Sequence, residues 1–99
     1  MKTRWTLSLT YGLTPFTVTA ELEYHSAQIM RIRVFGKKGS LLLENNYPYL
    51  LSQKSKKGIQ WKIKEGSLAD GSEKNSRLLL HMMEQLERFI KIDFPATTE

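Results

Sequence analysis

The sequence predicts an α+β domain in which an antiparallel β-meander of about five strands packs on one C-terminal α-helix. Apolar and polar residues alternate with a period of two in several segments between residues 4 and 64, and turn-forming residues separate these segments. From residue 72 onward, the apolar residues instead recur at the three- and four-residue spacing of an amphipathic helix. Because the strands all precede the helix, the order favours α+β over α/β.

The first two strands are predicted over residues 4–11 and 16–24, joined by a turn at Gly12–Pro15. Both segments are rich in β-branched and aromatic residues, which favour strands. The residues expected to face the core are Trp5, Leu7, Leu9 and Tyr11 in the first strand and Phe16, Val18, Ala20, Leu22 and Tyr24 in the second.

The third strand is predicted over residues 29–35, with Arg31 and Arg33 on its polar face. An uninterrupted antiparallel register places Glu23 opposite Arg31 and Glu21 opposite Arg33. A register slip of one residue would place carboxylates opposite apolar side chains. The charge pairs and the apolar face of the sheet therefore favour the same register.

The fourth strand is predicted over residues 40–45, where the same register sets Glu44 opposite Arg31. Residues 47–58 follow and are expected to be the least regular part of the chain. A fifth strand is predicted over residues 59–64, because apolar and polar residues alternate there again.

The helix is predicted over residues 72–92, with Asp70 or Ser72 as its cap. Its apolar stripe consists of Leu79, Met82, Met83, Leu86, Phe89 and Ile90. The chain is expected to form a single domain over residues 1–94, followed by a flexible tail at 95–99.

The composition restricts the function classes. The chain has 99 residues, a formal net charge of +5 and no cysteine. Disulfides and thiolate chemistry are therefore excluded, and a domain of this size without disulfides is typical of a reducing compartment, so a cytoplasmic location is expected. No run of 18 apolar residues is present, so no membrane association is expected.

Catalytic and metal-binding patterns are not found in the sequence. His25 and His81 have no partner at the spacing of a metal motif, and no nucleophile motif is present. The Gly36–Gly39 segment has lysines but not the spacing of a phosphate-binding loop, and a hairpin turn accounts for it. We therefore expect no metal, no cofactor and no enzymatic activity, although a small-ligand binder or enzyme stays open as a third hypothesis.

A basic region is the clearest indication of a partner. Lysines on a flexible loop, with aromatic residues nearby, are typical of proteins that grip single-stranded nucleic acid. The candidate nucleic-acid-binding residues are Lys54, Lys56, Lys57, Lys62, Lys64, Tyr47 and Tyr49. In architecture alone, a sheet with one C-terminal helix and a basic loop resembles the single-strand-binding coactivators, and that resemblance implies dimerisation through the helix.

The sequence has more apolar residues than one core between the sheet and the helix is expected to bury, which indicates self-association. Phe35 and Leu42 fall on the polar sheet face, where the 47–51 segment or a second subunit could cover them, and Leu78 is expected to face away from the core. The sequence therefore predicts a non-enzymatic binding or interaction domain that forms a homo-oligomer or binds a protein partner. Nucleic-acid binding by the 54–64 region is the alternative.

Overall fold

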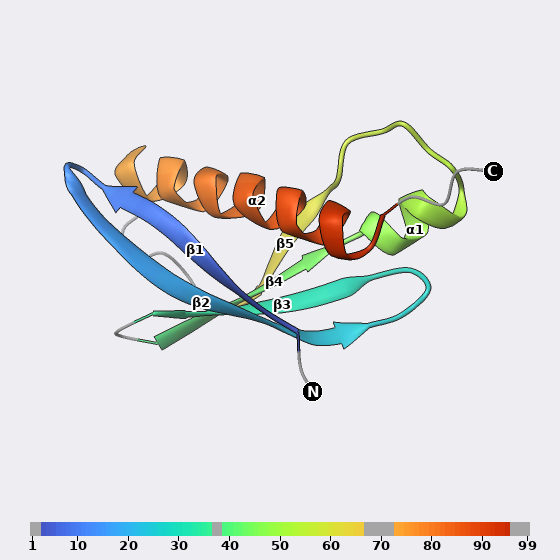
Figure 1. The fold of residues 1–99 in the computed structure, drawn as a ribbon, viewed down its shortest axis with the longest axis horizontal. Coiled ribbons are helices and arrows are strands. Elements are labelled where there is room, and N and C mark those ends of the chain that lie inside the picture. Colours follow the sequence, from blue (N-terminus) through green and yellow to red (C-terminus); the bar gives the residue numbers. More distant parts are fainter. Residues whose placement is uncertain (1–2, 37–38, 67–72, 96–99) are drawn as a thin grey trace.

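The computed structural model describes residues 3–36, 39–66 and 73–95. In these residues five antiparallel strands form one sheet in the order β1-β2-β3-β4-β5, so each strand pairs with its neighbours in the chain. The strands are β1 (Arg4–Tyr11), β2 (Thr14–His25), β3 (Met30–Gly36), β4 (Gly39–Asn45) and β5 (Trp61–Glu65), and the helices are α1 (Tyr47–Ser52) and α2 (Glu73–Asp93). The sheet is strongly curved, and α2 lies along one of its faces (Figure 1). The predicted fold class is confirmed.

The core lies between the sheet and α2. It is formed by the apolar residues at alternate strand positions and by one row of the helix. Its buried members are Trp5, Leu7, Leu9, Ala20, Met30, Ile32, Val34, Leu41, Leu43, Tyr47, Leu78, Met82, Leu86 and Ile90. Successive helix members are four residues apart, which is the spacing that keeps side chains on one face of a helix.

The helix orientation corrects one expectation. Leu78 is buried against the sheet and does not face away from it. Its place at the start of the four-residue row puts it on the same face as Met82 and Leu86. The helix instead leaves Leu80 exposed.

Both indole rings fix α2 above the sheet. Trp5 Nε1 donates a hydrogen bond to Asp93 Oδ2 at 2.7 Å, and Trp61 Nε1 donates to Glu87 Oε1 at 2.9 Å. Trp5 lies on β1 and Trp61 on β5, which are the two edges of the sheet. The helix is therefore held by polar contacts from both edges in addition to its apolar packing.

A β-bulge at Glu23 changes the predicted register between β2 and β3. Glu21 lies opposite Arg33 as expected, but beyond the irregularity Tyr24, and not Glu23, lies opposite Arg31. The extra residue turns Tyr24 to the face that carries Arg31. The expected inward orientation of Tyr24 is therefore wrong: the ring is 48% exposed and lies beneath the Arg31 guanidinium, 5.3 Å from ring centroid to Cζ.

The segment expected to be least regular contains a helix. Pro48 lies in the first turn of α1, where the missing N–H costs no helical hydrogen bond. Asn45 Oδ1 accepts a hydrogen bond from Tyr47 N–H at 2.9 Å, and Gln28 O accepts one from Tyr49 N–H at 3.2 Å. These contacts attach α1 to the end of β4 and to the β2–β3 turn.

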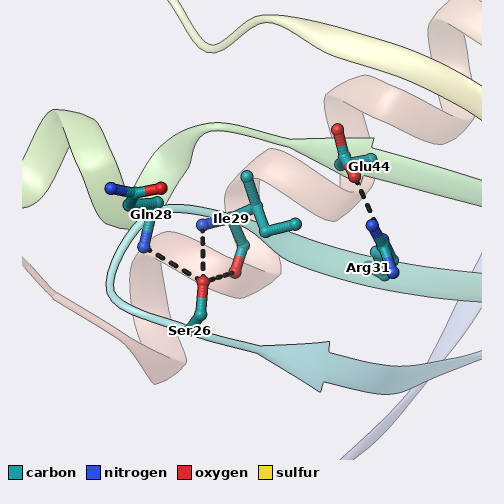
Figure 2. A network of polar contacts seen from close by, with 5 residues as sticks. All are labelled: Ser26, Gln28, Ile29, Arg31 and Glu44. Carbon is teal, nitrogen blue, oxygen red and sulfur yellow. Dashed lines mark hydrogen bonds and ion pairs between the residues drawn. The ribbon is translucent and has the colours of Figure 1, made fainter.

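The β2–β3 turn is itself held by one hydroxyl. Ser26 Oγ accepts hydrogen bonds from Gln28 N–H at 3.2 Å and Ile29 N–H at 3.1 Å, and it donates to Ile29 O at 3.4 Å (Figure 2). Hydrogen bonds therefore hold the turn, to which α1 is attached through Gln28, in one conformation.

The start of the fifth strand differs from the prediction, and two expectations are not tested. The fifth strand begins at Trp61, two positions later than predicted, after Gln60 N–H donates to Asn46 Oδ1 at 2.9 Å. The proposed cap at Asp70 or Ser72 lies outside the described residues, as do residues 96–99 of the tail predicted over 95–99.

Candidate interaction surfaces

The structure divides the predicted basic region between two places. Lys62 lies opposite Glu44 in the β4–β5 register, so it belongs to the sheet face away from α2. Lys64 is exposed and falls at an irregularity of that register, between Ile63 and Glu65. Lys56 and Lys57 instead line a hollow between α1 and the C-terminal part of α2, where Lys91 joins them. Lys54 is exposed just after α1. The five lysines therefore do not form one continuous track.

The two tyrosines of the basic region also differ. Tyr47 is buried, with 6% of its surface exposed, and its hydroxyl donates to Phe94 O at 2.7 Å. Burial raises the pKa of this hydroxyl above its ordinary value. Tyr49 is 47% exposed. Tyr47 is thus a core residue whose ring does not offer a face for a nucleotide base, and Tyr49 retains an accessible ring.

The hollow between the helices, here called the α1–α2 hollow, has a volume of about 550 Å³. Its apolar lining comes from α1 and from the loop before β5, with Leu51 and Ile59 as its partly buried members. Lys56, Lys57 and Lys91 are its basic lining residues. The sequence pattern indicated the two loop lysines but not Lys91, because only the fold brings the C-terminal part of α2 close to α1 and the loop that follows it.

The sheet face away from α2 carries paired charges. Arg31 Nε lies 3.0 Å from Glu44 Oε1 (Figure 2), and Arg4 Nε lies 3.0 Å from Glu21 Oε2. The predicted pairing of Glu44 with Arg31 is confirmed, whereas Glu21 lies opposite Arg33 in the register but forms its ion pair with Arg4, which was not predicted. The pairing of Glu23 with Arg31 is wrong, because the bulge displaces Glu23 along β2.

Arg33 is the centre of this network. Its Nε lies 2.6 Å from Glu23 Oε2, its Nη2 lies 3.0 Å from Glu65 Oε2, and its Nη1 donates to Ser40 Oγ at 2.9 Å. The hydrogen bonds to Glu23 and Glu65 raise the pKa of the Arg33 guanidinium above its ordinary value. The group therefore stays charged, and each of its three nitrogens donates a hydrogen bond within the protein.

The predicted interface residues are not equally accessible. Leu78 lies in the core, and Leu42 is buried on the opposite sheet face, where its register partners are Arg33 and Glu65. Phe35, at the end of β3, is 43% exposed. Among these three residues, Phe35 is the one that offers surface to a partner.

Exposed apolar side chains, including Phe35, lie at the end of the β1–β2 hairpin. Leu13 in the turn is 98% exposed, and Tyr11, which was expected to face the core, is 41% exposed. Tyr11, Phe16, Thr17 and Phe35 line one shallow depression of about 800 Å³. We call Tyr11, Leu13, Phe16, Thr17 and Phe35 the hairpin-end surface. The sequence signal for it is the absence of charged residues over residues 5–20.

Tyr11 is exposed because the hairpin extends past the rest of the sheet. The β2–β3 register begins at Thr19, so β2 residues before it have no partner on β3. The β1–β2 turn consists of Gly12 and Leu13, and Gly12 has φ 66°, as the first central position of a type II′ turn requires. The end of the hairpin is therefore a two-stranded ribbon, in which inward-facing positions have little to pack against.

Neither metal-binding geometry nor a membrane-spanning helix is seen in the described ranges. Within them, no three His, Asp or Glu side chains gather closely enough to hold a metal ion. No helix there combines the length and apolar character that crossing a membrane needs. Comparison of the chain with family models, curated proteins and solved structures gives no match.

Proposed function

We propose that this chain is a non-enzymatic interaction domain that self-associates through the hairpin-end surface. The observation that carries the proposal is that residues 5–20 contain no charged side chain, while Leu13, Tyr11 and the neighbouring Phe35 expose apolar surface there. Exposed apolar side chains gathered at one end of a small domain are typical of an interaction site.

Charge favours a second copy of this chain as the occupant. The chain carries a formal net charge of +5, so two copies repel each other over most approaches. Contact through residues 5–20 brings together two uncharged ribbons, which avoids opposing like charges. The threonines that alternate along both strands can supply hydrogen bonds at the rim of such a contact.

Association through side chains is favoured over pairing of sheet edges. Antiparallel pairing of two β5 strands would bring Lys62 and Lys64 of one copy against those of the other. The protruding part of β2 contains Pro15, which has no N–H to donate. Gln85 occupies the edge of β1 at Ser8. Each strand edge is thus obstructed, and the apolar hairpin-end surface is the more suitable contact.

The geometry supports nucleic-acid binding less well. The lysines proposed for it lie in two places, and Tyr47 is buried with its hydroxyl bonded to Phe94. A continuous strand-binding track needs basic and aromatic side chains along one groove.

Sedimentation velocity over a wide concentration range tests the proposal. We expect a reversible dimer that strengthens with added salt, because salt screens the repulsion between the basic copies and leaves apolar contact intact. Leu13→Glu should weaken the dimer by at least about tenfold without affecting folding, since the side chain is almost fully exposed.

Ile92→Glu provides the matched control, because Ile92 is an exposed apolar residue of α2 outside the hairpin-end surface. It should leave the dimer unchanged. A wild-type chain that stays monomeric throughout, or equal effects of the two substitutions, would overturn the proposal.

A further inference from the structure

We propose that the α1–α2 hollow binds a single-chain aliphatic anion, with its chain on the apolar lining and its head group among the lysines. The volume of about 550 Å³ falls within the range of small-ligand sites, roughly 300–1,000 Å³. The hollow lies where α1 and the loop that follows it approach the C-terminal end of α2 (Figure 1). This site is separate from the hairpin-end surface, so the inference does not rest on self-association.

The loop that forms one wall is held in a defined conformation. Ser55 N–H donates to Leu50 O at 2.9 Å, and Lys57 N–H donates to Ser55 Oγ at 3.1 Å. Lys54 has φ 50°, the left-handed conformation that reverses the chain after a helix. The backbone positions of Lys56 and Lys57 are therefore fixed before a ligand arrives, which lowers the entropy cost of binding.

The charge balance of the hollow favours an anion. Within the described residues Lys56, Lys57 and Lys91 form no ion pair, in contrast to Arg4, Arg31 and Arg33, which are all paired with carboxylates. The acidic lining residue is Glu87, whose Oε1 already accepts the hydrogen bond from Trp61 Nε1. The hollow is therefore lined by three lysines without an ion-pair partner in the described part of the chain and by one carboxylate, Glu87, that already accepts a hydrogen bond from Trp61.

The apolar lining favours an aliphatic chain over a base or another flat ring. Leu50, Leu51 and Ile59 contribute branched aliphatic side chains. The aromatic lining residue, Tyr47, is buried and its hydroxyl is bonded to Phe94, so it does not present a stacking face. A flexible hydrocarbon chain can fill an irregular apolar surface of this kind and gains free energy with each methylene group removed from water.

Titration calorimetry with decanoate, below its critical micelle concentration, tests the inference. We expect saturable binding, and binding at least about tenfold weaker for 1-decanol, which lacks the charge, and for acetate, which lacks the chain. Backbone amide shifts in NMR spectra should change at Leu51, Lys57 and Lys91. Decyltrimethylammonium, with the same chain and the opposite charge, should not bind.

Two lysine variants separate a specific site from general basicity. Combined Lys56→Gln, Lys57→Gln and Lys91→Gln substitutions should weaken decanoate binding by at least about tenfold. Lys62→Gln with Lys64→Gln removes exposed lysines of β5 that do not line the hollow, and it should leave decanoate binding unchanged. Equal effects of both variants, binding of the cationic amphiphile, or no saturable decanoate binding would overturn the inference. Binding of a single-stranded oligonucleotide but not decanoate at the same lysines would overturn it in favour of a nucleic-acid site.

Discussion

The side-chain amide of Gln85 on α2 closes the edge of β1 at Ser8. Gln85 Oε1 accepts a hydrogen bond from Ser8 N–H at 3.0 Å, and Gln85 Nε2 donates to Ser8 O. The amide thus satisfies the donor and the acceptor that an additional strand would otherwise bind. A residue of the helix therefore protects the middle of an edge strand, while the lysines of β5 protect the opposite edge.

Replacing Gln85 with alanine should reopen this edge. We expect the free energy of unfolding to fall by about 1–3 kcal/mol, because two hydrogen bonds worth about 1 kcal/mol each are lost. The variant should also associate more strongly at high concentration through the freed backbone groups of β1. Urea unfolding measures the first effect and sedimentation velocity the second.

Glu84→Ala is the control for this substitution, since Glu84 is the exposed neighbour of Gln85 and forms no ion pair within the described residues. It should change stability by less than about 0.5 kcal/mol. Indistinguishable unfolding curves for the two variants would show that the Gln85–Ser8 contact contributes nothing to stability.

The orientation of α2 is tested by two leucines that lie two positions apart. Leu78 is 8% exposed and Leu80 is 54% exposed. Leu78→Ala should destabilise the domain by about 2–5 kcal/mol, because it leaves a cavity against the sheet, whereas Leu80→Ala should cost less than about 1 kcal/mol. Thermal or urea unfolding distinguishes them, and a reversed order of the two losses would mean that the helix is rotated about its axis.

The alternation of residues predicted most of the fold, because period-two patterns and the helical stripe report directly on which side chains are buried. The β3–β4 register follows from local antiparallel pairing and was predicted in the same way, whereas the sequence left the order of the strands in the sheet open. The bulge at Glu23 could not be predicted, since one extra residue leaves the local composition unchanged while it reverses the orientation of Tyr24.

The candidate sites were less predictable than the fold, because they depend on contacts between distant segments. Helix α1 starts at Tyr47 and carries a proline in its first turn, but its attachment to Gln28 requires the β2–β3 turn to be in place. Lys91 joins the loop lysines through the packing of α2. Tyr11 fits the pattern of inward-facing residues in β1. It is exposed because β3 does not extend as far as this end of the hairpin, which the sequence of β1 does not show.

Because the Tyr47 hydroxyl is buried, we expect its contribution to the free energy of unfolding to fall at alkaline pH. Its raised pKa means that the unfolded chain, with an ordinary tyrosine pKa of about 10, ionises first as the pH rises. The stabilisation from the protonated Tyr47 hydroxyl is therefore complete below about pH 10 and is lost as the pH rises through the pKa of the folded state. Tyr47→Phe removes the hydrogen bond to Phe94 O, so near pH 7 it should be less stable than the wild type by about 1 kcal/mol.

Above about pH 10 this difference should shrink, because the wild type alone carries the ionisable group at position 47. Urea unfolding of both proteins at neutral pH and near pH 10.5 measures the change, and other titrating groups cancel in the comparison. Tyr49→Phe is the matched control, since Tyr49 is 47% exposed, and it should change stability by less than about 0.5 kcal/mol. A Tyr47→Phe difference that stays constant up to pH 10.5 would mean that burial does not hold this hydroxyl in its protonated form.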